Sequence, residues 1–185
     1  MTRRSLAAMV LAVAGLANGA QPLPTSENPD FQQVLSLALG PAPATDLEAQ
    51  VGAVLEAKPD LLKVRDSWGP LLLHAVDALS LGGDTAKRAR RLAELLLSRG
   101  ADPNGVDANG EPLLIHYAML VRLTPMQFLL AHGARADVQG REEGRSALHW
   151  AALIEEQERD GSFDAEMTRR ATGGAGALLA AGAPV

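Results

Sequence analysis

Cysteine is absent from this 185-residue sequence, and aromatic residues make up only 3% of it. The lack of cysteine excludes disulfide bonds, thiolate metal ligands, cysteine nucleophiles and a lipid-carrying N-terminal cysteine. Any fold must therefore rely on its core instead of disulfide bonds, and a chain of this length can bury a sizeable core. With so few aromatic residues, the positions of the two tryptophans become informative.

Basic residues are also scarce. Lys and Arg number 17 against 22 Asp and Glu, which gives a formal net charge of -5. Nucleic-acid binding requires a basic surface that displaces counterions, so we expect no nucleic-acid partner. The hydrophobic content of 47% and charged content of 21% are typical of a folded globular protein and not of a disordered chain.

The first twenty residues have the order of a secretory signal peptide. Arg3 and Arg4 precede an apolar run at residues 5–17, and small residues follow at 18–20. Thirteen residues make about 20 Å of helix, which is shorter than the roughly 30 Å hydrocarbon core of a bilayer. We therefore expect cleavage near Gly19 or Ala20, no stable membrane anchor afterwards, and a periplasmic or secreted protein. Residues 21–29, rich in proline and polar residues, are expected to form an extended leader.

Two phrases recur through the rest of the chain. The first has the form apolar-Leu-x-x-Gly-Ala and occurs at residues 96–101, 129–134 and 178–183. Its glycines are Gly100, Gly133 and Gly182, and the first two are separated by 33 residues. Leucines followed by a glycine at this spacing predict a helix that ends in a glycine cap.

The second phrase precedes each copy of the first. It is clearest at residues 144–152 (GRSALHWAA) and looser at residues 66–75 and 107–118, where it begins Asp-x-x-Gly. Asp-x-x-Gly predicts a turn, and the apolar run after it predicts a short helix.

The two phrases in this order resemble ankyrin repeats. The resemblance covers roughly residues 46–185 and implies an all-α solenoid of about four helix-turn-helix repeats joined by β-turn fingers. The expected domain spans residues 30–185, with repeats near 30–65, 66–106, 107–139 and 140–185. Each repeat is too small to bury a core alone, so its neighbours must stack on it.

Departures from the pattern are also expected to shape the fold. The first repeat is degenerate, with helices near residues 30–39 and 46–58 and with Lys58 in place of the capping glycine. Eight surplus residues fall near residues 79–85 and sixteen within residues 155–172. In the first surplus segment, Gly82-Gly83-Asp84 is expected to be a loop with Asp84 as the helix N-cap.

Catalytic and metal-binding patterns receive little support. The resemblance implies that His74 and His149 tie the turns of neighbouring repeats together by hydrogen bonds. No histidine pair has the H-E-x-x-H spacing of a zinc site, and no serine lies in a G-x-S-x-G elbow. We therefore expect no enzymatic activity, no cofactor and no metal.

In ankyrin proteins the finger tips and first helices usually form the binding face, and this resemblance selects the candidate residues. Trp68 on a finger is the strongest candidate, because exposed tryptophan is a common interface anchor. Trp150 either contacts a partner or packs between repeats. Acidic finger residues favour a partner with a basic surface. The candidates are Ser67, Trp68, Ala108, Asn109, Glu111, Glu142, Glu143, Arg145 and Trp150.

The expected function is therefore that of an exported, monomeric protein that binds another protein as a helper or scaffold. An alternative is an immunity protein that inhibits a toxin or hydrolase in the periplasm. A third hypothesis is a ligand-binding or hydrolytic domain, which would require a pocket around His149 or Glu155.

Overall fold

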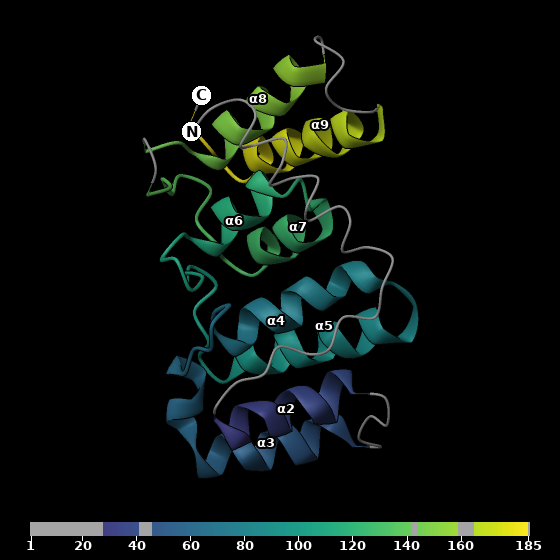
Figure 1. Ribbon diagram of the computed structural model, residues 1–185, viewed down its shortest axis with the longest axis vertical. Helices are drawn as coiled ribbons and strands as arrows, with labels where there is room; N and C mark the ends of the chain where they lie inside the picture. Colours follow the sequence, from purple (N-terminus) through teal and green to yellow (C-terminus); the bar gives the residue numbers. More distant parts are fainter. Residues whose placement is uncertain (1–27, 41–45, 142–143, 159–164, 185) are drawn as a thin grey trace. The chain divides into compact units, whose positions relative to one another are not determined.

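The computed structural model describes residues 28–40, 46–141, 144–158 and 165–184. Every regular element in these ranges is a helix, and β pairing is limited there to three isolated bridges (Figure 1). The expected all-α class is confirmed. The predicted signal peptide, residues 21–27 of the predicted leader, Glu142 and Glu143 lie outside the described residues.

The chain divides into two compact units. One is Leu23–Leu113, and the other contains Leu114–Val185. The helices of the first unit are α2 (Pro29–Leu39), α3 (Leu47–Ala57), η2 (Pro59–Lys63), α4 (Leu71–Asp77), η3 (Ala78–Leu81) and α5 (Gly83–Ser98). Those that follow are α6 (Leu113–Met119), α7 (Leu123–Ala131), α8 (Ala147–Glu158) and α9 (Ala165–Ala180).

The first helix pair is set by local capping signals. Asn28 accepts hydrogen bonds from the backbone N–H groups of Asp30 and Phe31 at 3.0 and 3.2 Å, and Pro29 occupies the first helical turn of α2. Asp46 caps α3 in the same way, through the N–H of Ala49. The two helices expected for the degenerate repeat are thus both present.

Lys58 ends α3 without a left-handed residue. Its φ is -138° and its N–H donates to the carbonyl of Val54. Pro59 follows and begins η2, so the ring of proline supplies the stop that glycine supplies elsewhere. The Lys58 ammonium pairs with Asp30 at the start of α2.

In the first unit, α2 packs against α3, and α4 packs against α5 (Figure 1). The two pairs meet where α2 and α3 contact α5, and Phe31, Leu35, Leu71 and Leu92 are fully buried. Such leucine and phenylalanine side chains each contribute roughly 1.5–3 kcal/mol when removed from water.

Arg88 of α5 and Arg99, the C-cap residue that follows α5, also join the helix pairs. Arg88 Nε donates to the carbonyl of Ala38 at 3.1 Å, and Arg99 Nη1 donates to the carbonyl of Gly52 at 3.2 Å. Gly52 permits this approach, because a Cβ there would lie 3.1 Å from Arg99 Nη2. Both carbonyls belong to the first helix pair, so α5 is held to it by polar contacts as well as apolar ones.

The surplus near residues 79–85 extends the second helix pair. Its residues form η3 after α4 and lengthen the start of α5. The expected loop with Asp84 as N-cap is wrong, because α5 already begins at Gly83 and its N-cap is Gly82, with φ 75°. Asp84 lies inside the first turn and its carboxylate pairs with Lys87 at 2.9 Å, so it is not available for capping.

The three recurring glycines adopt the same helix end. Gly100, Gly133 and Gly182 have φ values of 94°, 90° and 84°. In each case the alanine after the glycine donates its N–H to the carbonyl of the leucine five residues earlier, at 2.9 to 3.0 Å. This is the Schellman motif, which places a left-handed residue just after the helix. The glycine caps predicted by the first phrase are confirmed.

The turn after α6 has the same geometry without glycine. Val121 has φ 54°, and Arg122 N–H donates to the carbonyl of Tyr117 at 3.0 Å. A β-branched residue in the left-handed region is strained. The side chain of Val121 is only 5% exposed and lies in a buried cluster with Ala171, so apolar burial offsets the strain.

The glycines at 173–176 lie within α9 and allow a close helix contact. A Cβ on Gly173 would lie 3.0 Å from Leu123 of α7, and one on Gly174 would lie 3.4 Å from Met126. Gly176 faces open space. The surplus of residues 155–172 is divided between the end of α8 and the start of α9, with residues 159–164 outside the described ranges.

Candidate protein-binding surface

Asp66 organises the turn of residues 65–70 in the Leu23–Leu113 unit, which we call the first turn. Its Oδ1 accepts hydrogen bonds from the N–H groups of Trp68 and Gly69 at 2.8 and 3.0 Å, and an antiparallel bridge between Arg65 and Pro70 closes the turn. Ser67 is exposed at the tip. Trp68 beside it is 50% exposed, so half of a large apolar side chain faces solvent.

The turn of residues 106–112, which we call the second turn, repeats this arrangement with one more residue. Asp107 is buried, and its Oδ1 accepts from the N–H groups of Asn109 and Glu111 at 2.8 and 2.9 Å. A bridge between Val106 and Pro112 closes it. Ala108 and Asn109 are exposed at its tip, whereas Glu111 is half-buried.

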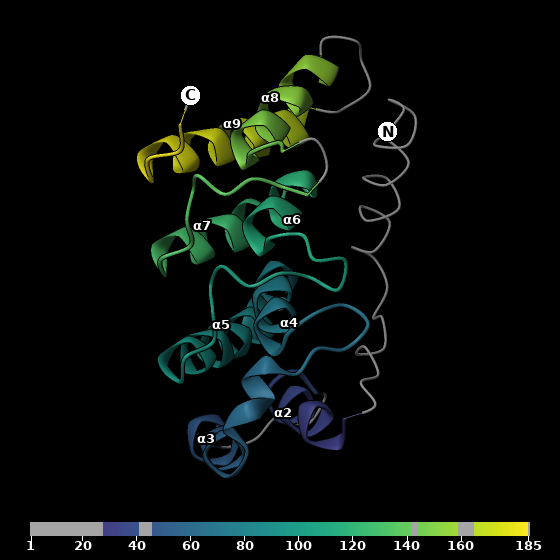
Figure 2. The same cartoon turned by 90° about the vertical axis from the view of Figure 1, so that its left-hand side faces the viewer.

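The tips of these two turns are in direct contact. The carbonyl of Trp68 accepts a hydrogen bond of 2.9 Å from the N–H of Ala108. Gly69 is needed there, because its φ is 152° and a Cβ would lie 3.3 Å from Cα of Asp107. Both turns project on the side of α4 in Figure 2. We call the exposed residues that they bring together the tip surface: Ser67, Trp68, Ala108 and Asn109.

Arg145 and Trp150 lie in the second unit, and the structure corrects the expectation that Trp150 contacts a partner. Trp150 is 3% exposed, so it is not a surface anchor, and the alternative that it packs inside the fold describes it better. Arg145 is half-buried, with its guanidinium carbon 5.3 Å from the centre of the Trp150 ring, a cation–π distance. The indole is therefore covered by Arg145 instead of being offered to a partner.

His74 and Asp66 form a buried pair behind the first turn. Nε2 of His74 lies 3.0 Å from Oδ2 of Asp66, and the two side chains are 7% and 1% exposed. The atoms are in contact without the directed geometry of a hydrogen bond. Burial raises the pKa of Asp66, but the two backbone donors from Gly69 and Trp68 and the neighbouring His74 outweigh it, and the net pKa is lowered.

His149 occupies the equivalent position in α8 but makes a different contact. Its Nδ1 lies 2.7 Å from Ser146 Oγ and accepts from the Ser146 N–H at 3.3 Å, while its own N–H donates to Ser146 Oγ. This reciprocal pair is a capping box with histidine in the place of glutamate. The two histidines do not form the expected link between neighbouring turns. His74 contacts Asp66, which lies in the turn just before its own helix, and His149 contacts Ser146, which lies just before α8.

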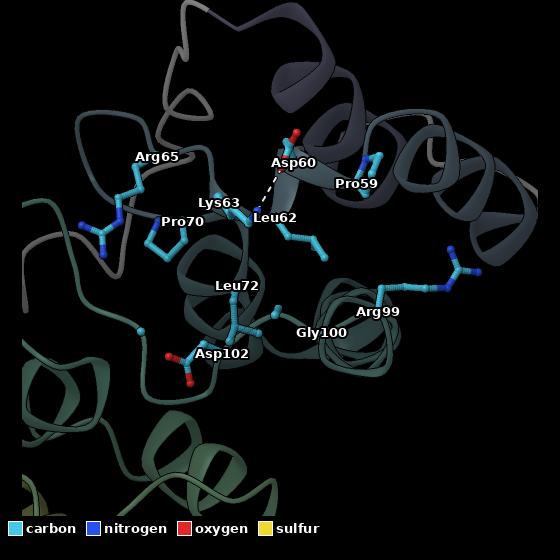
Figure 3. A pocket seen from close by; sticks show the side chains of 12 residues that line it. Pro59, Asp60, Leu62, Lys63, Arg65, Pro70, Leu72, Arg99, Gly100 and Asp102 are labelled. Carbon is cyan, nitrogen blue, oxygen red and sulfur yellow. Dashed lines mark hydrogen bonds and ion pairs between the residues drawn. The ribbon is translucent and has the colours of Figure 1, made fainter.

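A pocket of about 480 Å³ opens below the first turn (Figure 3). Its walls come from η2, from the stem of the first turn, from Leu72 of α4 and from the loop after α5. Sequence reasoning missed it, because its walls are brought together by packing between helix pairs and share no local motif. Its charged side chains are Asp60, Lys63, Arg65, Arg99 and Asp102.

Within the described ranges, no group of three or more His, Asp or Glu side chains lies close enough to hold a metal ion. None of the helices in those ranges has the length and apolar character needed to cross a bilayer.

No family model matches the sequence.

Proposed function

We propose that this chain is a short ankyrin-repeat protein that binds another protein through the tip surface. The finer fold in this proposal is a solenoid of about four helix pairs. It is supported by the order of local structures along the chain: an Asp-anchored or glycine-containing turn, a short helix, a second helix and a Schellman glycine. This order recurs after Asp66 and Asp107, and the same elements follow Gly140, where Glu142 and Glu143 lie outside the described residues.

Exposure of Trp68 is the observation that carries the binding proposal. Large apolar side chains are costly to leave in water, and a tryptophan on a rigid turn is a common interface anchor. The turn that presents it is rigid, because Asp66 accepts two backbone hydrogen bonds and the Trp68 carbonyl accepts a third hydrogen bond, from the N–H of Ala108. The tip surface therefore offers a partner an ordered aromatic group with little entropy left to lose.

A binding role is also favoured over catalysis by how the ionisable groups are used. His74 and Asp66 face each other in the interior and support the first turn. Asp107 holds the second turn through two backbone N–H groups. These groups serve the architecture of the tip surface, and we propose no enzymatic reaction, cofactor or metal.

The physiological role that we propose is that of a monomeric helper or scaffold for another exported protein. Export is inferred from the basic, apolar and small-residue order of residues 1–20. The net charge of -5 favours a partner with a basic surface, through association rate and specificity.

This proposal is tested by using residues 21–185 as bait for affinity capture from periplasmic extract and by identifying the captured partner by mass spectrometry. Trp68→Ala should weaken capture of the partner at least tenfold and lower the melting temperature by no more than a few degrees, because the loss of an interface tryptophan costs about 2 kcal/mol or more in binding. The matched control is Leu81→Ala, which removes another exposed apolar side chain, 71% exposed, from outside the tip surface.

Leu81→Ala should leave capture unchanged. Equal losses for the two variants would contradict the proposal, as would a Trp68→Ala protein that captures the partner as well as the unaltered chain does. A large fall in melting temperature for Trp68→Ala would instead assign the indole to the core.

A further inference from the structure

The two tryptophans of the chain differ in what covers the ring. The ring of Trp150 already has a cation beside it, because the guanidinium carbon of Arg145 lies 5.3 Å from its centre. Trp68 is 50% exposed, and within the described residues its ring takes part in no cation–π or aromatic pair. The faces of an indole ring carry negative charge density and attract cations. Trp68 is therefore the ring that the chain leaves available to a cation from another molecule.

Acidic residues predominate in the two segments that present Trp68. These segments are the first turn and residues 100–112, which include the second turn, and together they contain one Arg and no Lys. Four carboxylates accompany the single Arg65 there: Asp66, Asp102, Asp107 and Glu111. The formal charge around the exposed indole is therefore negative, and it favours a positively charged group.

Two of these carboxylates belong to the turn that touches Trp68. Ala108, whose N–H donates to the Trp68 carbonyl at 2.9 Å, directly follows Asp107. The N–H of Glu111 donates to Asp107 Oδ1 at 2.9 Å, so both acidic residues lie in the same closed turn. With a Debye length of about 8 Å at physiological salt, the charges of this adjoining turn act on a group bound at Trp68.

The basic residues of the flanking elements are paired within the protein. Lys63 of η2 lies 3.0 Å from Asp60, and Arg99 after α5 lies 3.4 Å from Glu56. Arg65 is the basic residue of the two segments themselves, and it opposes a cation at Trp68. It is exposed at the base of the first turn, where solvent screens its charge.

We propose that Trp68 binds an arginine side chain of the partner protein, with the guanidinium stacked on the exposed part of the indole. A guanidinium is planar, always charged and more weakly hydrated than an ammonium group, so it stacks on an aromatic face at a lower desolvation cost than lysine does. Ser67 beside the indole is exposed, and its hydroxyl oxygen can accept a guanidinium N–H. This inference rests on the proposed protein-binding function and specifies the side chain that the tip surface recognises.

Panning a random twelve-residue peptide display library on residues 21–185 tests this preference. Enriched peptides should carry Arg, and synthetic copies should bind in fluorescence anisotropy with an affinity that falls as salt rises. Replacing that Arg by citrulline, which keeps the planar shape but has no charge, should weaken binding roughly tenfold. Lys in the same place should bind more weakly than Arg does.

Two substitutions of Trp68 separate the ring from its apolar area. Trp68→Leu keeps an apolar side chain without a ring and should weaken the Arg peptides roughly tenfold, whereas Trp68→Phe should retain part of the affinity. In a double-mutant cycle, Trp68→Leu in the protein and citrulline in the peptide should together cost less than the sum of the two single changes, because both remove the same contact. Melting curves establish that both variants fold.

Two charge removals test the sign of the surrounding charge. Arg65→Gln should strengthen binding of the Arg peptides roughly threefold, and Glu111→Gln should weaken it by roughly the same factor. The matched control is Arg91→Gln, which removes a positive charge from an exposed position of α5 outside the tip surface. This control should leave the affinity unchanged.

The arginine proposal is overturned by enrichment of no peptide, by Arg peptides that bind Trp68→Leu as tightly as the unaltered protein, or by citrulline peptides that bind as tightly as Arg peptides. Apolar peptides without Arg that are weakened by Trp68→Ala would also overturn it, while leaving binding at the tip surface intact. Failure of the broader function is measured separately, by the capture experiment with Trp68→Ala and Leu81→Ala.

Discussion

The backbone carbonyl of Trp68 accepts a 2.9 Å hydrogen bond from the N–H of Ala108, so two turns that lie far apart in the sequence meet tip to tip. The contact involves only main-chain atoms, and it leaves both side chains free to vary. A rigid main-chain scaffold beneath exposed side chains is the arrangement expected of a surface that recognises a partner.

Asp66 should stabilise the first turn in two separable ways. Asp66→Asn keeps an oxygen for the N–H groups of Trp68 and Gly69 and removes the charge beside His74. Asp66→Ala removes both, and it should cost about 1–3 kcal/mol of unfolding free energy because a buried acceptor is lost. Asp66→Asn should cost less, as measured by urea unfolding at pH 7.

The charge-dependent part of this effect has a defined pH dependence. The pKa of Asp66 is lower in the folded protein than in the unfolded chain, so its ionised form adds stability above the unfolded pKa, about 4 for aspartate. That stability is lost as the pH falls through the lower, folded pKa. The stability difference between the unaltered protein and Asp66→Asn should therefore shrink towards pH 3, and a difference that grows instead would contradict the assignment.

At Val121, substitution by glycine should leave a more stable protein than substitution by alanine, which is the reverse of the usual order of stability. Val121→Ala and Val121→Gly both lose the buried side chain, but only glycine relieves the left-handed strain at φ 54°. The glycine variant should therefore be more stable than the alanine variant by roughly 1 kcal/mol, as measured by chemical unfolding. An alanine variant that is the more stable of the two would show that this position is not strained.

The glycines of α9 and of the helix ends should respond in opposite directions to alanine. Gly176 lies in a helix with open space around it, so Gly176→Ala should stabilise the protein by about 0.5–1 kcal/mol. Gly133→Ala must adopt φ near 90° and should destabilise by about 1 kcal/mol or more. Gly173→Ala should gain less than Gly176→Ala, because its Cβ presses on Leu123. Thermal melts of the three variants provide the comparison.

The cap formed by Ser146 and His149 should tolerate glutamine but not alanine. His149→Gln places an acceptor at the third helical position, where a capping box normally has Glu or Gln, and should retain most of the stability. His149→Ala leaves the Ser146 N–H without its acceptor. Ser146→Ala removes the N-cap side chain and should cost about 0.5–2 kcal/mol of unfolding free energy. Equal stability of His149→Ala and His149→Gln in urea unfolding would indicate that the histidine does not cap α8.

Local signals were read correctly from the sequence where the structure depends on nearby residues. The helices around residues 30–39 and 46–58, the Asp66 and Asp107 turns and the three glycine caps all follow from hydrogen bonds that span five residues or fewer. Asp84 was misassigned because two adjacent glycines resemble a loop, although Gly82 can itself provide the cap.

Features that depend on contacts distant in sequence were not predicted. The burial of Trp150 under Arg145 is decided by packing, since an apolar ring on a short helix is compatible with either face. The hydrogen bond from Arg99 to Gly52 spans 47 residues, and nothing in either local sequence indicates it. The pocket lined by Arg65 and Leu72 is likewise a product of tertiary structure. The candidate residues of the tip surface could be predicted because the two turns that carry them have a local Asp-x-x-Gly signature.

Each helix that ends at Gly100, Gly133 or Gly182 terminates through hydrogen bonds to its own last turn. The stopping point of such a helix needs no information from elsewhere in the chain. Segments can therefore be lengthened, duplicated or deleted upstream without displacing the boundary. The length of the chain between two such boundaries can therefore change while the boundaries themselves keep their places.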